Sequence, residues 1–181
     1  MTENELLRTA QAEGFCAAVV NTADIAVNYD FRRYCEENLC GKYGANYSCP
    51  PDCGTPQQVH EKLVSKSKAL VLQKIYPING YGDTEAITRA KMSVNRSVLN
   101  VLDKMSEAGY RGMPLGYNGC PLCNPCNRTL GSPCAFPERK ISCISAYCID
   151  VTKLAQLAGM EFGWSEEKLC LFGMITFDGT E

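Results

Sequence analysis

Residues 68–75 read KALVLQKI and residues 84–108 read TEAITRAKMSVNRSVLNVLDKMSEA, and these two stretches decide the fold. The first has a central apolar run, which predicts a buried strand. The second repeats apolar side chains at intervals of three and four residues, the spacing of one helix face. A buried strand followed by a long amphipathic helix predicts helices packed on a sheet. The apolar stripe of the helix consists of Ile87, Ala90, Val94, Val98, Val101, Leu102 and Met105.

Shorter segments on either side carry similar signals. Thr55 and Gln58 form a capping box around Pro56 and start a helix, and Asp150 caps another. We expect an α/β fold, with α+β as the alternative, built on a single mixed sheet with flanking helices. We expect residues 1–181 to form a single metal-binding domain with cysteine-rich loops at about 28–56 and 119–148. The remaining predicted elements are helices at 3–13 and 151–158 and strands at 15–20 and 169–177.

Composition narrows the class of function. The chain has 181 residues, a net charge of −2 and 12 cysteines. This charge gives no basic field for nucleic acid. The N-terminus lacks an apolar signal-peptide core, and no apolar run is long enough for a membrane span. We therefore expect a cytoplasmic protein, in which dense cysteine indicates metal or redox chemistry rather than disulfides.

The strongest motif is GCPLCNPCNRTLGSPCAFP, residues 119–137. Its cysteines are spaced C-x2-C-x2-C-x7-C-x2-P, which is close to the cysteine run that holds 4Fe–4S clusters in bacterial ferredoxins. Arg128 is the only charged residue from 112 to 137, and an apolar shell suits a cluster shielded from water. The spacing favours a 4Fe–4S cluster on Cys120, Cys123, Cys126 and Cys134.

Zinc is the alternative cofactor, and free thiols are a third interpretation. Structural zinc sites usually use two well-separated C-x2-C pairs, which three closely spaced cysteines match less well. Mixed Cys/His zinc sites have little support, because His60 is the only histidine and lies outside the cysteine clusters. His60 falls in a charged helical stretch and is expected on the surface.

A second cysteine group has a less regular spacing. Cys35, Cys40, Cys49 and Cys53 are separated by four, eight and three residues in an irregular, glycine- and proline-rich stretch. They indicate either a second cluster or zinc site, or a mixed role in which one or two of them complete the first site. The nearby basic residues either act on an anion or thiol or form a solvated patch; they are Arg32, Arg33 and Lys42.

The other cysteines carry weaker signals. Cys16 and Cys170 fall in apolar strand patterns and are expected in the core. Cys143 and Cys148 precede the Asp150 cap. They are either second-site ligands or redox partners, or they simply pack near the helix, which is the simpler interpretation.

Three segments in this order resemble a prokaryotic family known as predicted metal-binding proteins, a domain of unknown function. They are YGANYSCPP at 43–51, GCPLCNPCNRTLGSPCAFPE at 119–138 and AYCIDV at 146–151. The resemblance implies metal or cluster ligands at Cys120, Cys123, Cys126 and Cys134, with Cys40 and Cys49 also functional. This chain differs from the family pattern at Cys143, Ser145 and Cys148, which adds two thiols.

Three functions are compatible with these residues. Four cysteines saturate a cluster and favour electron transfer with a redox partner protein. If only Cys120, Cys123 and Cys126 bind, the open iron acts as a Lewis acid on a small, sulfur-containing substrate. A zinc-stabilised interaction module is the third function. The sequence gives no sign of the oligomeric state.

Overall fold

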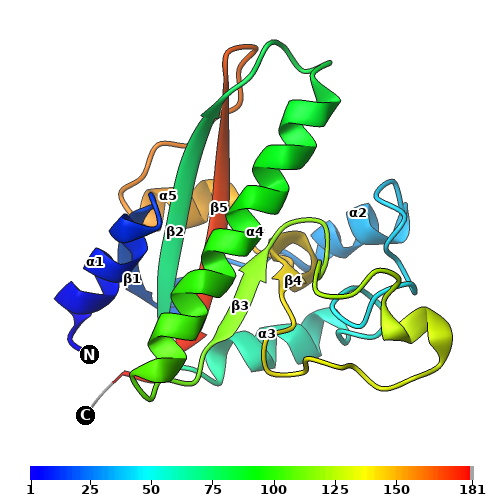
Figure 1. Ribbon diagram of the computed structural model, residues 1–181, viewed down its shortest axis with the longest axis horizontal. Coiled ribbons are helices and arrows are strands. Elements are labelled where there is room, and N and C mark those ends of the chain that lie inside the picture. The colour runs from blue at the N-terminus through cyan, green and yellow to red at the C-terminus, as the bar shows by residue number, and fades with distance from the viewer. Residues whose placement is uncertain (180–181) are drawn as a thin grey trace.

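Five strands form one open, mixed sheet in the computed structural model, which describes residues 1–179 (Figure 1). β2 and β5 are the long central strands and pair antiparallel from Lys68 opposite Phe177 to Pro77 opposite Lys168. β3 pairs antiparallel with β5 and parallel with β4. The order across the sheet is β1 (Cys16–Asn21), β2 (Lys68–Pro77), β5 (Lys168–Phe177), β3 (Met113–Gly116) and β4 (Ser142–Cys143).

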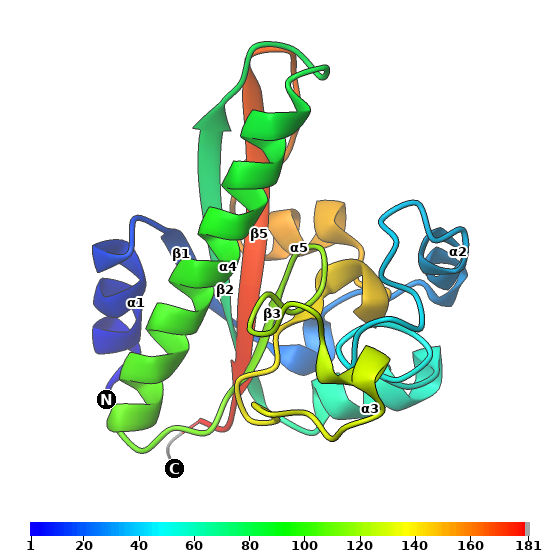
Figure 2. The same cartoon turned by 45° about the vertical axis from the view of Figure 1, so that its right-hand side comes forward.

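Five α-helices in the described residues accompany the sheet. α1 and α4 lie on one face, and α3 and α5 lie on the other (Figures 1 and 2). This confirms the predicted single mixed sheet with flanking helices. Because most strand pairs are antiparallel, the class is α+β, the second of the two predicted classes. The helices are α1 (Glu3–Ala12), α2 (Arg32–Glu36), α3 (Pro56–Val64), α4 (Thr84–Glu107) and α5 (Val151–Leu157).

The apolar run in β2 is continuous because both faces of the sheet are covered. Leu70 and Leu72 pack in the core beneath α1 and α4, whereas Ala69 and Val71 pack in the core beneath α3 and α5. Side chains alternate between the two faces of a strand, so a strand buried on both faces loses the polar–apolar alternation of a half-exposed strand.

The predicted helix starts are present. The Thr55 side chain accepts a hydrogen bond from the Gln58 backbone N–H, and the Gln58 side chain binds back to Thr55, completing the capping box. The Asp150 side chain caps α5 by accepting from the Lys153 backbone N–H. These contacts satisfy donors that the first helical turn leaves free.

One expectation about the edge of the sheet is wrong. Residues 15–20 were expected to form a buried strand with Cys16 in the core, but Cys16 is exposed and only Val20 of β1 is buried. β1 is an edge strand that pairs with β2 alone, so part of its surface faces solvent. The sequence also gave no signal for β3, β4 or α2, which are short.

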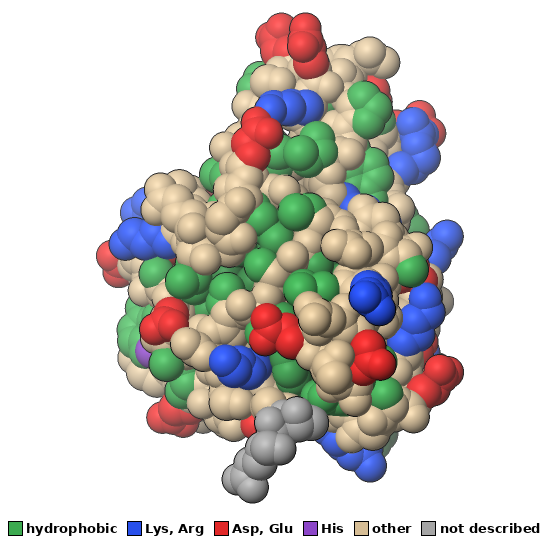
Figure 3. Space-filling model, turned by 90° about the vertical axis from the view of Figure 1, so that its left-hand side faces the viewer, with side chains coloured by type: hydrophobic (Ala, Val, Ile, Leu, Met, Phe, Trp, Pro, Cys, Tyr) green, Lys and Arg blue, Asp and Glu red, His purple; other side chains and the backbone are tan. Residues whose placement is uncertain are grey.

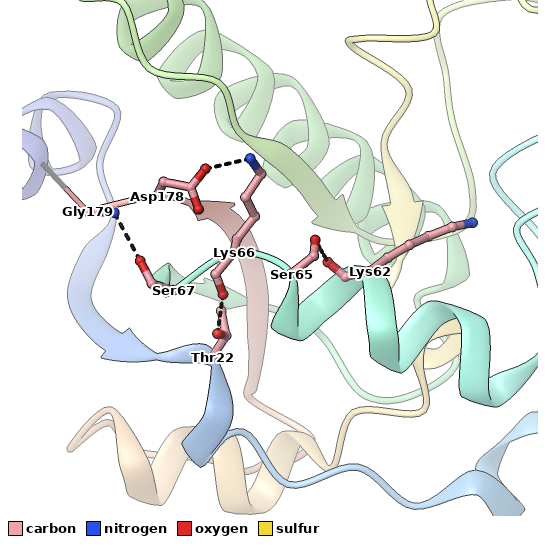
Figure 4. A network of polar contacts seen from close by, with 7 residues as sticks. All are labelled: Thr22, Lys62, Ser65, Lys66, Ser67, Asp178 and Gly179. Atoms are coloured by element: carbon pink, nitrogen blue, oxygen red, sulfur yellow. Dashed lines mark hydrogen bonds and ion pairs between the residues drawn. The ribbon is translucent and has the colours of Figure 1, made fainter.

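Polar contacts tie the N-terminal end of β2 to the ends of β1 and β5 (Figure 4). The Thr22 hydroxyl donates to the Lys66 carbonyl. Lys66 also pairs with Asp178 at 2.7 Å, and the Gly179 backbone N–H donates to the Ser67 hydroxyl at 3.1 Å. Three strand ends are thereby joined at one corner of the sheet.

The surface carries charges of both signs. On the face shown in Figure 3, basic and acidic side chains are interspersed with apolar ones, and neither sign forms a large field. Within residues 1–179, no helix combines the length and the apolar character that crossing a membrane requires.

Close packing against α4 is predicted to leave no room for a side chain at position 173 in β5, which is why glycine is required there. A Cβ atom at this position would lie 2.4 Å from Val98 Cγ2. We expect Gly173→Ala to lower the free energy of unfolding by about 1–3 kcal/mol through overpacking. Adding Val98→Ala should restore part of that loss, because it removes the clashing methyl group. Urea denaturation tests this, with Gly163→Ala as the control, since a Cβ there meets no atom within 4 Å. Equal effects of the two glycine substitutions would contradict the prediction.

Candidate metal centre

Two cysteine-rich loops meet beside the β3–β4 edge of the sheet (Figures 1 and 2). The first joins α2 to α3 and spans residues 37–55, and the second joins β3 to β4 and spans residues 117–141. They correspond to the two irregular stretches expected from the sequence. We call them the 37–55 loop and the 117–141 loop.

Hydrogen bonds connect the two loops at Cys120. The Asn46 side-chain amide donates to the Cys120 carbonyl at 3.2 Å. The Cys120 backbone N–H donates to the Ser48 hydroxyl at 2.9 Å, and that hydroxyl donates to Asn46 Oδ1 at 2.6 Å. Asn46 and Ser48 are both buried. The backbone of Cys120 is therefore held on both sides by the other loop.

Two further contacts hold the loops together nearer the surface. The Tyr47 hydroxyl donates to the Ser132 carbonyl at 2.9 Å, and Arg128 pairs with Asp52 at 2.7 Å. Arg128 is thus the partner of an acid in the 37–55 loop. The Arg128 guanidinium is therefore paired with the Asp52 carboxylate, and this ion pair links the two loops.

The four cysteines of the strongest motif line one small cavity. Cys120, Cys123, Cys126 and Cys134 are all partly buried there. Leu122 and Phe136 belong to the same lining, together with Asn46, Tyr47 and Lys140, and the lining contains no carboxylate. The free space between them is about 10 Å³, roughly what one water molecule occupies.

Burial disfavours ionisation of the Cys120 thiol. Desolvation raises the pKa of Cys120, and hydrogen bonding from the backbone N–H groups of Leu122 and Ile141 opposes that rise. Donors of this kind stabilise negative charge on sulfur. The site therefore contains groups that would stabilise a thiolate, within an environment that otherwise disfavours one.

The second cysteine group is only partly brought together. Cys35, Cys40 and Cys49 line a cavity of about 180 Å³, and the fourth cysteine in that lining is Cys143. Burial, reinforced by the nearby Cys143, raises the pKa of Cys35 and that of Cys49 to about 12 each. Cys143 reaches this cavity because β4 pairs with β3. The spacing of Cys35, Cys40 and Cys49 in the sequence does not predict that contact.

Cys53 lies outside that lining. It is 3% exposed and packs in the core beneath α3 and α5, and it lines a different cavity with Lys62 and Tyr147. Burial raises the pKa of Cys53, and the positive charges of Arg32 and Lys62 oppose that rise. Cys53 is thus a buried thiol whose nearest charges are cationic.

Four further candidates line neither cysteine cavity. Cys148 and Cys170 are buried, as expected for Cys170. His60 is half-buried rather than fully exposed, and its Nδ1 lies 2.8 Å from the Tyr29 hydroxyl. Arg32 is only 7% exposed, so of the two interpretations of the basic residues, the solvated patch does not apply to Arg32.

The donor chemistry fits an iron–sulfur cluster, but the first cavity has to widen to admit one. Within residues 1–179, no three Cys, His, Asp or Glu side chains converge closely enough to hold a single metal ion. A zinc ion with Zn–S bonds of about 2.3 Å would need the sulfurs drawn within about 4 Å of one another. A cluster, whose irons occupy separate corners, would instead need the 117–141 loop to move outward.

Comparison with known proteins yields one match. A family described as predicted metal-binding protein (DUF2284) matches residues 18–177. Neither the curated proteins nor the solved structures give a significant match. The matched range includes both cysteine-rich loops.

Ser48 is predicted to be the main link between the loops. We expect Ser48→Ala to lower the free energy of unfolding by about 1–3 kcal/mol, because it leaves the partly buried Cys120 N–H without its acceptor. Urea denaturation measures the loss. Alkylation followed by mass spectrometry should show faster labelling of Cys120.

Ser65→Ala is the matched control, because that exposed hydroxyl only donates to the Lys62 carbonyl at the end of α3. If Ser48→Ala and Ser65→Ala give the same stability and the same Cys120 labelling, the proposed link between the loops is wrong.

Proposed function

The chain belongs to this family of predicted metal-binding proteins, and we propose that it carries a 4Fe–4S cluster and serves in electron transfer. The proposed ligands are Cys120, Cys123, Cys126 and Cys134. An electron carrier of this kind would exchange electrons with a redox partner protein in the cytoplasm.

One observation carries the proposal: the four cysteines of a ferredoxin-like spacing line one cavity that contains no carboxylate and no histidine. Cysteine thiolates are the usual ligands of iron–sulfur clusters. Hard cations such as Mg²⁺ and Ca²⁺ prefer oxygen ligands, above all carboxylates. This lining contains no carboxylate. The donor set therefore supports iron–sulfur or zinc, and the spacing favours iron–sulfur.

The surrounding residues have roles that suit a shielded redox centre. Leu122 and Phe136 contribute apolar surface to the lining, which limits the approach of water. Backbone N–H groups directed at the Cys120 sulfur stabilise negative charge there, and such hydrogen bonds raise the potential of a cluster. Asn46 and Ser48 fix the Cys120 backbone from the other loop.

The remaining ligands sit in a segment with little regular structure. Between Cys126 and Cys134 the chain forms only a short 3-10 turn, Asn127–Leu130. Cys123 and Cys126 lie outside any helix or strand. This segment lies outside the sheet, so widening of the cavity around a cluster would leave the strand pairing in place. When bound, a cluster with four thiolate ligands supplies reversible one-electron chemistry and has no open iron.

Cys134→Ala is predicted to separate the candidate functions. After anaerobic preparation, we expect the unmodified chain to contain iron and sulfide in equal amounts and to show iron–thiolate charge-transfer absorbance. Loss of one of four ligands should remove or strongly weaken the signal from this cluster in visible and EPR spectra. Cys16→Ala is the matched control, because that thiol is exposed on β1 and lines neither cysteine cavity.

Two outcomes would contradict the proposal. A full, unchanged cluster in Cys134→Ala would favour a three-cysteine cluster with an open iron, as in an enzyme that uses the iron as a Lewis acid. A colourless protein with about one zinc per site would favour a zinc-stabilised module.

A further inference from the structure

Four thiols from three separate segments line the cavity of about 180 Å³ described above. Cys35 belongs to α2, Cys40 and Cys49 to the 37–55 loop, and Cys143 to β4. We propose that these four cysteines form a second metal site, which holds an iron–sulfur cluster beside the first. The inference goes beyond the proposed function, because it does not require a cluster on the 117–141 loop.

The topology explains why Cys143 takes part. β3 and β4 run parallel, with Gly116 opposite Cys143, so β4 ends where the 117–141 loop begins. The 3-10 turn that follows, Ile144–Tyr147, packs against α2. That packing brings Cys35 to Cys143 although 108 positions separate them in the chain. Gly119 belongs to the same cavity lining, so the 117–141 loop closes one side of it.

The size of the cavity suits a group larger than one ion. Its free space of about 180 Å³ exceeds the space for one water molecule about tenfold. The first cavity, in contrast, has about 10 Å³. Apart from the thiols, the lining combines apolar and aromatic side chains with Lys42, Asn118 and Ser145, and it contains no carboxylate and no histidine. The four cysteines are therefore the only set of four metal-binding side chains in this lining.

Arg32 acts electrostatically on Cys35 although it does not line the cavity, and it has no acidic partner in the described part of the chain. Arg32 is buried, and its terminal nitrogens donate to the carbonyls of Gly54 and Ala146 at 2.9 Å each. Its Nε has no partner among residues 1–179, and no carboxylate of those residues pairs with it. Lys42 is a second cation and belongs to the lining itself. A buried cation needs compensation, and a cluster with four thiolates supplies negative charge.

Cys53 does not serve in this site. It lies on the side of Arg32 where Lys62 and Tyr147 line a separate cavity. It is 3% exposed and packs in the core beneath α3 and α5. Cys143, which is only partly buried and lines the same cavity as Cys35 and Cys49, takes its place.

The two sites meet at Gly119. A Cβ atom there would lie 2.9 Å from the Cys49 sulfur, and Gly119 directly precedes Cys120. The residue also has φ +73, a conformation that glycine adopts readily. Gly119 thus allows a ligand of the second site to pack directly against the chain that carries a ligand of the first.

The test compares Cys143→Ala with Cys53→Ala in the full-length chain. Each variant is purified without oxygen and reconstituted with ferrous iron and sulfide, and iron, sulfide and EPR signals are measured. We expect Cys143→Ala to lose the iron and sulfide of the second site, which is about half of the total when both sites are filled, and Cys53→Ala to keep them. Cys40→Ala is the second variant, because that thiol is exposed and its loss spares the core; it should match Cys143→Ala. Circular dichroism confirms that each variant is folded.

The outcomes also separate this site from the first. If Cys134→Ala keeps its iron while Cys143→Ala and Cys40→Ala lose theirs, the second site stands and the proposed function fails. If Cys143→Ala and Cys40→Ala keep all of their iron, or if Cys53→Ala loses as much as they do, the second site is wrong. Zinc bound with the same cysteine dependence would overturn the assignment of an iron–sulfur cluster.

Discussion

Burial of both faces of the β2–β5 pair is the constraint on which the rest of the structure depends. Two ten-residue strands with apolar side chains on both faces need a helical layer on each side. α1 with α4, and α3 with α5, supply those layers. Both cysteine loops therefore lie outside the central sheet, beside the β3–β4 edge. The location of the candidate metal sites follows from how the core is covered.

The elements that the sequence predicts well are those with a strong local pattern. α4 has a long apolar stripe, α3 has its capping box, and β2 and β5 have apolar runs. β3 and β4 have four and two residues, too few for any periodicity to appear. The burial of a strand is also decided by its neighbours: β1 has an apolar sequence, yet Cys16 is exposed because β1 lies at an edge.

The two candidate sites differ in how far the sequence can reveal them. The cysteines between 120 and 134 lie within 15 residues, so their local spacing already implies that they lie near one another. The second cavity depends on Cys143, which reaches Cys35 only through the β3–β4 pairing and the packing of α2. No local spacing encodes such a contact. For the same reason Cys53, which is close in sequence to Cys49, was expected beside it but points into the core.

Because the 37–55 loop and the 117–141 loop contact each other, metal binding in one cavity would affect the order of both loops. Cys49 is buried and Cys35 is partly buried, and burial raises the pKa of both thiols, so binding a metal there would release protons. The two cores lie beneath α1, α3, α4 and α5, and the loops contribute Cys53 and Ile141 to them. The loops are held by their mutual contacts, with Ser48 and Asn46 against Cys120 at the centre. A cluster in either cavity would act on both loops, because each loop contributes residues to the lining of both cavities.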